Sequence, residues 1–126
     1  MKQQNNLLKS DKHEIFTGFR KENTIEAKLL VGAAFKDEGT SYYKIRLMMF
    51  PGYTYYLVKN QNAVDKYTVY SRIVVDDKNK NQVKFLNPVG NGILDSKLQS
   101  YLEVRFPMLR AYVYMSLYPQ KQNYKE

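Results

Sequence analysis

The chain contains no cysteine, no tryptophan and only one histidine among its 126 residues. The lack of cysteine excludes a disulfide scaffold, a thiolate zinc site and a cysteine nucleophile. A single histidine excludes a metal motif built on two histidines and leaves only His13 for a Ser-His-Asp triad. No apolar run approaches the length of a membrane span, which needs about 20 residues. Residues 1–12 also lack the apolar stretch of a signal peptide, so we expect a cytoplasmic protein.

Basic residues exceed acidic ones, and most of the excess lies in the part of the chain that should fold. Lysine and arginine number 20 against 12 aspartates and glutamates, which gives a formal net charge of +8. The polar segments 1–12 and 119–126 contribute +3 of that charge, and residues 13–118 contribute +5. A positive body attracts polyanions, although a moderately basic surface can also serve solubility alone.

Alternation of apolar and polar residues predicts strands over most of the chain. Turn residues such as Pro51-Gly52 separate the segments. One segment, 24–36, should bend near Gly32, and a helix is the alternative for it. The predicted strands are 13–20, 24–36, 40–49, 53–59, 66–75, 82–86 and 108–118.

A helix is predicted for residues 93–106, because apolar side chains recur there at helical spacing and Pro107 follows as a stop. The spacing involves Leu94, Leu98, Tyr101, Leu102 and Arg105. Hairpin-connected strands imply an antiparallel sheet, so we expect an α+β fold with this helix packed on a curled or barrel-like antiparallel sheet of six to seven strands. A single α+β domain should cover residues 13–118, between a disordered N-terminal segment, 1–12, and a polar C-terminal tail, 119–126.

Twelve tyrosines are present, and several alternate with lysine or arginine on strand faces that would normally meet water. If these strands share a sheet, they form an aromatic surface that carries positive charge. Single-stranded nucleic acid uses this combination, because bases stack on rings at about 1–3 kcal/mol each while cations contact phosphates. The predicted contact residues are Tyr42, Lys44, Arg46, Lys66, Tyr70, Arg72, Arg110, Tyr112 and Tyr114. We therefore predict a non-catalytic protein that binds single-stranded DNA or RNA.

Two other interpretations explain the same tyrosines. A tyrosine-rich face or a free sheet edge can join protomers into a homo-oligomer, or attach the chain to a larger bacterial assembly of the secretion or conjugation type. The rings can also form a second layer of core, because cross-strand aromatic pairs stabilise sheets by about 0.2–1 kcal/mol.

No residues combine into a catalytic, metal or cofactor site, so we expect no enzyme, no metal and no cofactor. His13 has no visible catalytic partner and should be a surface residue. The acidic pairs Asp37-Glu38 and Asp76-Asp77 suit turns and lack the ligand spacing of an EF-hand. Gly90-Asn91-Gly92, ahead of the predicted helix, is similar to a phosphate-binding loop but lacks the Lys-Ser/Thr ending of a P-loop.

Short motifs follow one another over residues 32–72. They are Gly32-Ala33-Ala34-Phe35-Lys36, Tyr43-Lys44-Ile45-Arg46-Leu47, Phe50-Pro51, Tyr56-Leu57-Val58 and Tyr70-Ser71-Arg72. Their order resembles a small bacterial family of unknown function that occurs on plasmids and integrative elements. The family pattern is Gly-Ala-Ala-Trp-Lys, Tyr-x-Ser-Val-Lys-Leu, a proline-containing turn, a strand and Trp-Ser-Arg, with Phe35 and Tyr70 standing here at the tryptophan positions. The resemblance implies a mobile-element context, in which DNA handling is expected, and it assigns no catalytic residues.

Overall fold

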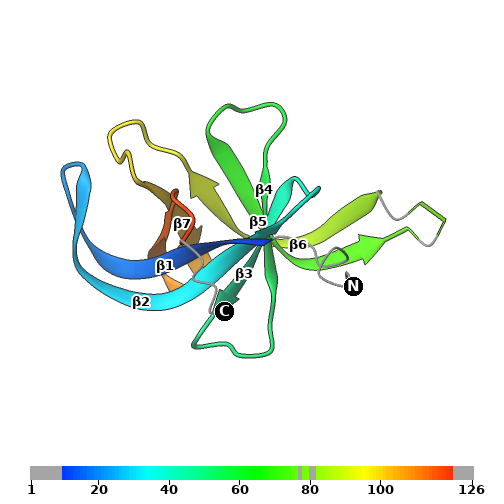
Figure 1. Cartoon of the computed structure of the whole chain (residues 1–126), viewed down its shortest axis with the longest axis horizontal. Helices are drawn as coiled ribbons and strands as arrows, with labels where there is room; N and C mark the ends of the chain where they lie inside the picture. Colours follow the sequence, from blue (N-terminus) through cyan, green and yellow to red (C-terminus); the bar gives the residue numbers. More distant parts are fainter. Residues whose placement is uncertain (1–9, 77, 80–81, 121–126) are drawn as a thin grey trace, which may run out of the picture.

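Eight antiparallel strands close into a barrel in the computed structural model, which describes residues 10–76, 78–79 and 82–120. Each strand pairs with its neighbours in the chain, and the last strand pairs with the first to complete the barrel (Figure 1). The strands are β1 (Ser10–Lys21), β2 (Thr24–Asp37), β3 (Tyr42–Leu47), β4 (Tyr55–Lys59), β5 (Lys66–Val75), β6 (Val83–Ile93), β7 (Tyr101–Phe106) and β8 (Ala111–Ser116). A 3-10 turn, η2 (Pro107–Leu109), connects β7 to β8.

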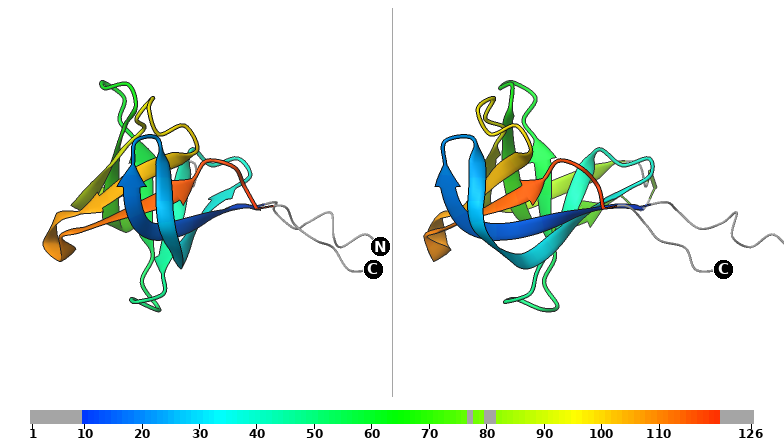
Figure 2. Two further views of the ribbon diagram at one scale, coloured as in Figure 1. Left: turned by 90° about the vertical axis from the view of Figure 1, so that its left-hand side faces the viewer. Right: turned by 60° about the vertical axis from the view of Figure 1, so that its left-hand side comes forward.

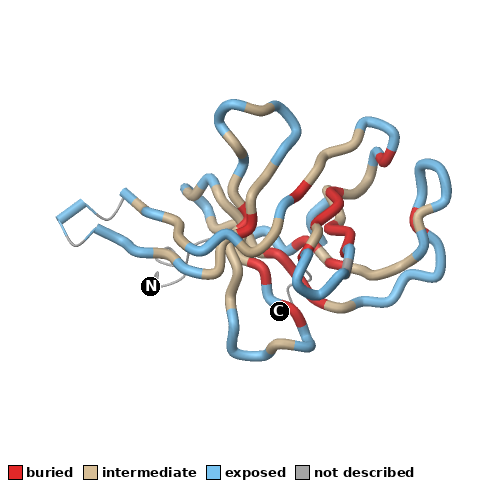
Figure 3. The backbone as a smooth tube through the Cα atoms, turned by 180° about the vertical axis from the view of Figure 1, so that it is seen from behind, coloured by how far each residue is buried: buried red, intermediate tan, exposed pale blue. Residues whose placement is uncertain are grey.

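The barrel interior is filled by side chains from the inner faces of the strands. Alternation along each strand turns every second residue inward, so Ile15, Ile45 and Leu57 are fully buried. Strand β6 presents Gly92 on this side, where a Cβ atom would lie 3.0 Å from the side chain of Leu102 and 3.2 Å from that of Leu57. Figure 3 shows the buried residues along the barrel strands and the exposed ones at the hairpin ends. The core consists of Ile15, Ala34, Ile45, Leu47, Leu57, Val69, Leu102, Val104, Phe106, Val113 and Met115.

The segment predicted as a bent strand, 24–36, is a strand and not a helix. The β1–β2 pairing shifts register between Ile15 and Phe16, which lie opposite Gly32 and Leu30, so the irregularity falls at the predicted place. Glycine is required at position 32 because a Cβ atom there would overlap the backbone carbonyl oxygen of Arg46 on β3.

The predicted helix over 93–106 is wrong, and with it the α+β class and the count of six to seven strands. Among the described residues the only helical piece is η2, and residues 101–106 form β7. Alternation places Leu102, Val104 and Phe106 inside the barrel, where burial of each large apolar side chain contributes about 1.5–3 kcal/mol. No helix in these ranges is both long and apolar enough to cross a membrane.

Two of the leucines that suggested a helix, Leu94 and Leu98, belong to a loop, residues 94–100, which precedes β7. Leu98 is fully buried there against Ile25 of β2 and Tyr114 of β8. Asp95 closes a turn in this loop, because its Oδ1 atom accepts a hydrogen bond from the Lys97 backbone N–H at 2.9 Å. The β1–β2 hairpin curls over the same side of the barrel, as Figure 2 shows.

The β5–β6 hairpin extends beyond the barrel as an arm. Residues 71–75 of β5 and 83–86 of β6 have no ladder partner on β4 or β7 and pair only with each other. We call these residues the β5–β6 arm, which projects to the right in Figure 1. Strand β1 begins at Ser10, within the segment predicted as disordered, and residues 1–9 and 121–126 lie outside the described residues.

Candidate nucleic-acid interface

The nine predicted contact residues lie at several separate places outside the barrel core, and one of them, Tyr114, is buried there. Tyr42 and Tyr70 lie on the same side as Tyr56 and Phe85, and we call these four residues the aromatic cluster. The ring centroid of Phe85, on the β5–β6 arm, is 5.2 Å from that of Tyr42 and 5.6 Å from that of Tyr70. Tyr42 and Tyr56 meet edge to face at 6.1 Å. These half-buried rings pack on one another and form a second layer outside the barrel.

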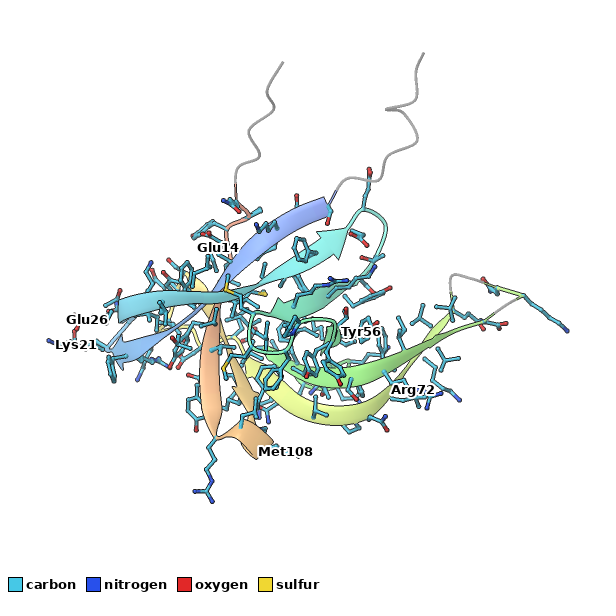
Figure 4. All side chains as sticks on the ribbon, turned by 90° about the horizontal axis from the view of Figure 1, so that it is seen from below. Glu14, Lys21, Glu26, Tyr56, Arg72 and Met108 are labelled. Carbon is cyan, nitrogen blue, oxygen red and sulfur yellow. The ribbon has the colours of Figure 1, made fainter. Side chains whose placement is uncertain are left out.

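Of the predicted cations of β3 and β5, only Lys44 is a register partner of a ring of the aromatic cluster, Tyr56, and its charge is paired within the protein. Lys44 Nζ forms a salt bridge of 3.1 Å with Asp37, and their hydrogen bond raises the pKa of Lys44 and lowers the pKa of Asp37. Arg46, Lys66 and Arg72 are exposed and form no ion pair with another described residue. Figure 4 shows Arg72 out on the β5–β6 arm.

Tyr114 is not open to solvent. Only 5% of it is exposed, because it packs with Ile25 and Leu98 beneath the loop 94–100. Burial raises the pKa of its hydroxyl, and the nearby carboxylate of Glu103 raises it further. A base cannot stack on this ring, so Tyr114 does not belong to a contact surface.

Arg110 and Tyr112 lie together with two residues that the sequence analysis missed, Asn91 and Arg105. Asn91, Arg105 and Tyr112 are register partners across β6, β7 and β8, so they share the outer face. The guanidinium carbon of Arg105 lies 4.8 Å from the ring centroid of Tyr112, which is 52% exposed. These residues and Pro107 line a hollow of about 490 Å³. We call Asn91, Arg105, Arg110 and Tyr112 the arginine–tyrosine site.

A buried carboxylate fixes the orientation of Arg105. Its Nε atom donates a hydrogen bond of 2.5 Å to Glu103 Oε2, and Glu103 is only 4% exposed. The other oxygen of Glu103 lies 3.5 Å from the guanidinium of Arg20, which also pairs with Asp95 at 2.7 Å. Since only Nε of Arg105 is used in this contact, its Nη groups stay beside the Tyr112 ring as donors.

Arg110 supplies the uncompensated charge of the site. It follows η2 in a left-handed conformation, with φ of 50°, and it is exposed. It forms no ion pair with any residue in the described part of the chain. Since Glu103 and Asp95 balance Arg105 and Arg20, the surroundings of the hollow carry a net positive charge.

The predicted surface does not form one continuous platform. Tyr42 on β3 is separated from Tyr112 on β8 by five of the eight strand-to-strand pairings of the closed barrel. The register partners that connect these two tyrosines are Val58, Thr68, Asn91 and Arg105. Barrel closure therefore turns the aromatic cluster and the arginine–tyrosine site toward different sides. In Figure 4, Tyr56 marks the first on the right and Met108 of η2 marks the second at the bottom.

Three further predictions concern His13, the segment Gly90-Asn91-Gly92 and the pair Asp76-Asp77. His13 is not a surface residue: it is 5% exposed, its Nδ1 atom lies 2.9 Å from the carbonyl oxygen of Ser116, and its ring meets Tyr43 edge to face. Gly90-Asn91-Gly92 lies within β6 and not ahead of a helix, so it is not a phosphate-binding loop. Of the pair Asp76-Asp77, Asp77 lies outside the described residues.

Comparison of the chain with protein-family models, with curated proteins and with solved structures found no match. The resemblance of residues 32–72 to a mobile-element family therefore stays a prediction.

Proposed function

We propose that the protein binds single-stranded DNA or RNA through the arginine–tyrosine site and catalyses no reaction. The observation that carries the proposal is the Arg105 guanidinium, held 4.8 Å from the ring centroid of the half-exposed Tyr112. Arg110, which forms no ion pair with a described residue, lines the same hollow. A cytoplasmic location and a mobile-element context belong to the same proposal.

Each residue of the arginine–tyrosine site has a distinct role in it. An unstacked base lies on the exposed part of the Tyr112 ring, and the planar guanidinium of Arg105 adds a cation–π contact. Arg110 binds an adjacent phosphate. The amide of Asn91 both donates and accepts hydrogen bonds, which suits a base edge. A duplex has no free base faces and cannot use the ring in this way.

Fluorescence anisotropy with labelled oligo-dT, and with a duplex of equal length, tests the proposal at several salt concentrations. We expect the single strand to bind more tightly, with a log–log salt slope of about −0.7 per phosphate contact. Tyr112→Ala should weaken binding by about 1–3 kcal/mol, the value of one stacked base, while Tyr112→Phe keeps the ring and the affinity.

Two arginine variants separate this site from diffuse charge attraction. Arg110→Ala should reduce the steepness of the salt slope by about 0.7, because one phosphate contact is lost. Arg72→Ala removes the same charge from the β5–β6 arm and should change neither slope nor affinity at the site. Equal effects of the two arginine variants, or equal binding of single strand and duplex, would contradict the proposal.

A further inference from the structure

A second hollow lies on another side of the barrel, against β2, β3 and the β3–β4 loop, residues 48–54. It encloses about 340 Å³. Three large apolar side chains at this hollow, Leu30, Met48 and Tyr53, are 41%, 61% and 65% exposed. Exposed apolar side chains scattered singly are ordinary, but several around one hollow mark an interaction site.

Charged residues flank the floor of this hollow. Ala33 of β2 pairs in register with Glu14 of β1 on one side and with Arg46 of β3 on the other. The small side chain of Ala33 leaves space between the two charges, which lie two strand spacings apart, or about 10 Å. Lys12 also lines the hollow. Neither Lys12 nor Arg46 forms an ion pair with a described residue. With Glu14 as the one acidic residue among those that line the hollow, its rim carries more positive than negative charge.

We propose that this hollow docks a short segment of a partner protein in which an aromatic or large aliphatic residue lies next to an acidic residue. The anchor side chain fills the space between Ala33, Met48 and Tyr53, and the carboxylate of the segment pairs with Arg46. The volume is at the lower end of small-molecule sites, about 300–1,000 Å³, which suits one anchor side chain better than a whole cofactor. Methionine is flexible at each bond, so Met48 adapts to the shape of the anchor.

The site is separate from the arginine–tyrosine site, so the two proposals can fail independently. In Figure 4, Glu14, which flanks this hollow, lies above and to the left of Met108, which marks the neighbourhood of Arg110. No residue lines both hollows.

Nuclear magnetic resonance titration of the isotope-labelled full chain tests this docking site with two capped dipeptides, acetyl-Glu-Phe-amide and acetyl-Lys-Phe-amide. We expect the acidic peptide to shift the backbone amides of Gly32, Ala33 and Met48. Its affinity should exceed that of the basic peptide about three- to fivefold, since an exposed ion pair contributes up to about 1 kcal/mol. The amides of Arg110 and Tyr112 should not move.

Charge reversal and a matched control make the result specific. Arg46→Glu should reverse the preference between the peptides, whereas Arg72→Glu makes the same charge change on the β5–β6 arm and should leave it unaltered. Tyr53→Ala should weaken both peptides. Absence of a preference, or shifts spread over the whole surface, would overturn the proposal. Movement of the same amides with protein concentration alone would assign the hollow to a second copy of the chain instead.

Discussion

At the scale of single residues, Tyr43 and Tyr67 illustrate how position in the barrel sets the chemistry of a phenol. Both are partly buried and pack against the barrel core. Burial raises the pKa of each hydroxyl, and proximity to Tyr67 raises the pKa of Tyr43 further, because two neighbouring phenolates repel each other. Tyr112, on the outer face, is half exposed and can offer its ring to a ligand.

The raised pKa of Tyr43 predicts a loss of stability in alkali. The phenol titrates at about 10 in the unfolded chain and at a higher pH in the folded protein. The folded state therefore holds its proton longer. The contribution to the free energy of unfolding is complete below about pH 10 and falls as the pH rises through the folded pKa. Tyr43→Phe has no hydroxyl to ionise, so its stability should fall less steeply over this range.

Urea denaturation of the two proteins at a series of alkaline pH values measures this difference. The exposed Tyr118 offers a control, because Tyr118→Phe should leave the pH dependence of the free energy of unfolding as it is in the natural chain. Identical alkaline profiles for Tyr43→Phe and the natural chain would show that the buried phenol does not limit stability.

At the scale of elements, the position of the β5–β6 arm depends on the ring of Phe85. Phe85 contacts Tyr42, Tyr56 and Tyr70, and these contacts join the arm to the outer face of β3 and β4. The tyrosines of the aromatic cluster therefore position the arm, and their ring faces are largely used within the protein. Tyr42 and Tyr70 were predicted to stack on bases because sequence alternation shows which face a ring occupies and not what covers it.

Removal of the Phe85 ring should release the arm. Phe85→Ala is expected to lower the free energy of unfolding by about 1–3 kcal/mol, less than for a fully buried phenylalanine because the ring is half-buried. Hydrogen exchange of amides in residues 71–75 should accelerate while the barrel amides stay protected. Val74→Ala, at an exposed position on the same arm, should change stability by less than about 0.5 kcal/mol. Unchanged exchange in Phe85→Ala would mean that the ladder alone holds the arm.

Strands with uninterrupted alternation were predicted well, and interrupted ones were not. The predicted strand 66–75 matches β5 at both ends. By contrast, β6 was predicted only over 82–86, because Gly90-Asn91-Gly92 was interpreted as a loop ahead of the predicted helix. Pro88 is tolerated since this part of β6 has no ladder partner on β7. The pairing of β5 with β6 also shifts register beside it.

At the scale of the whole molecule, two short seams complete the barrel. Strands β8 and β1 share two register pairs, Ile15 with Met115 and Phe16 with Tyr114, and β6 and β7 share three. The hydrogen bond between His13 and Ser116 reinforces the first seam. Barrel stability therefore depends on how closely the strands approach at these seams.

Gly90 should be essential for the seam between β6 and β7. A Cβ atom at this position would overlap the backbone carbonyl oxygen of Arg105, and backbone cannot move aside as a flexible side chain can. Gly90→Ala is expected to lower the free energy of unfolding by about 2–3 kcal/mol. Displacement of Arg105 should also weaken binding of oligo-dT. Calorimetry and anisotropy measure the two effects.

A glycine in open space provides the comparison. Gly39 lies in a turn with φ of 87° and has no atom near its missing side chain, so Gly39→Ala meets backbone strain alone. It should lower stability by about 1 kcal/mol and leave nucleic-acid binding intact. Equal behaviour of the two variants would argue against a steric role for Gly90.

The sequence by itself determined the local features of this protein. Its alternating strands, its positive charge, its lack of thiol chemistry and the outward position of Tyr112 follow from residue identity and from the period of two along a strand. Only the tertiary structure decided that residues 101–106 form a strand, that Tyr114 is covered, and that Arg105 lies on Tyr112. These outcomes depend on closing eight strands around one core, which brings together residues whose spacing along the chain gives no sign of their contact.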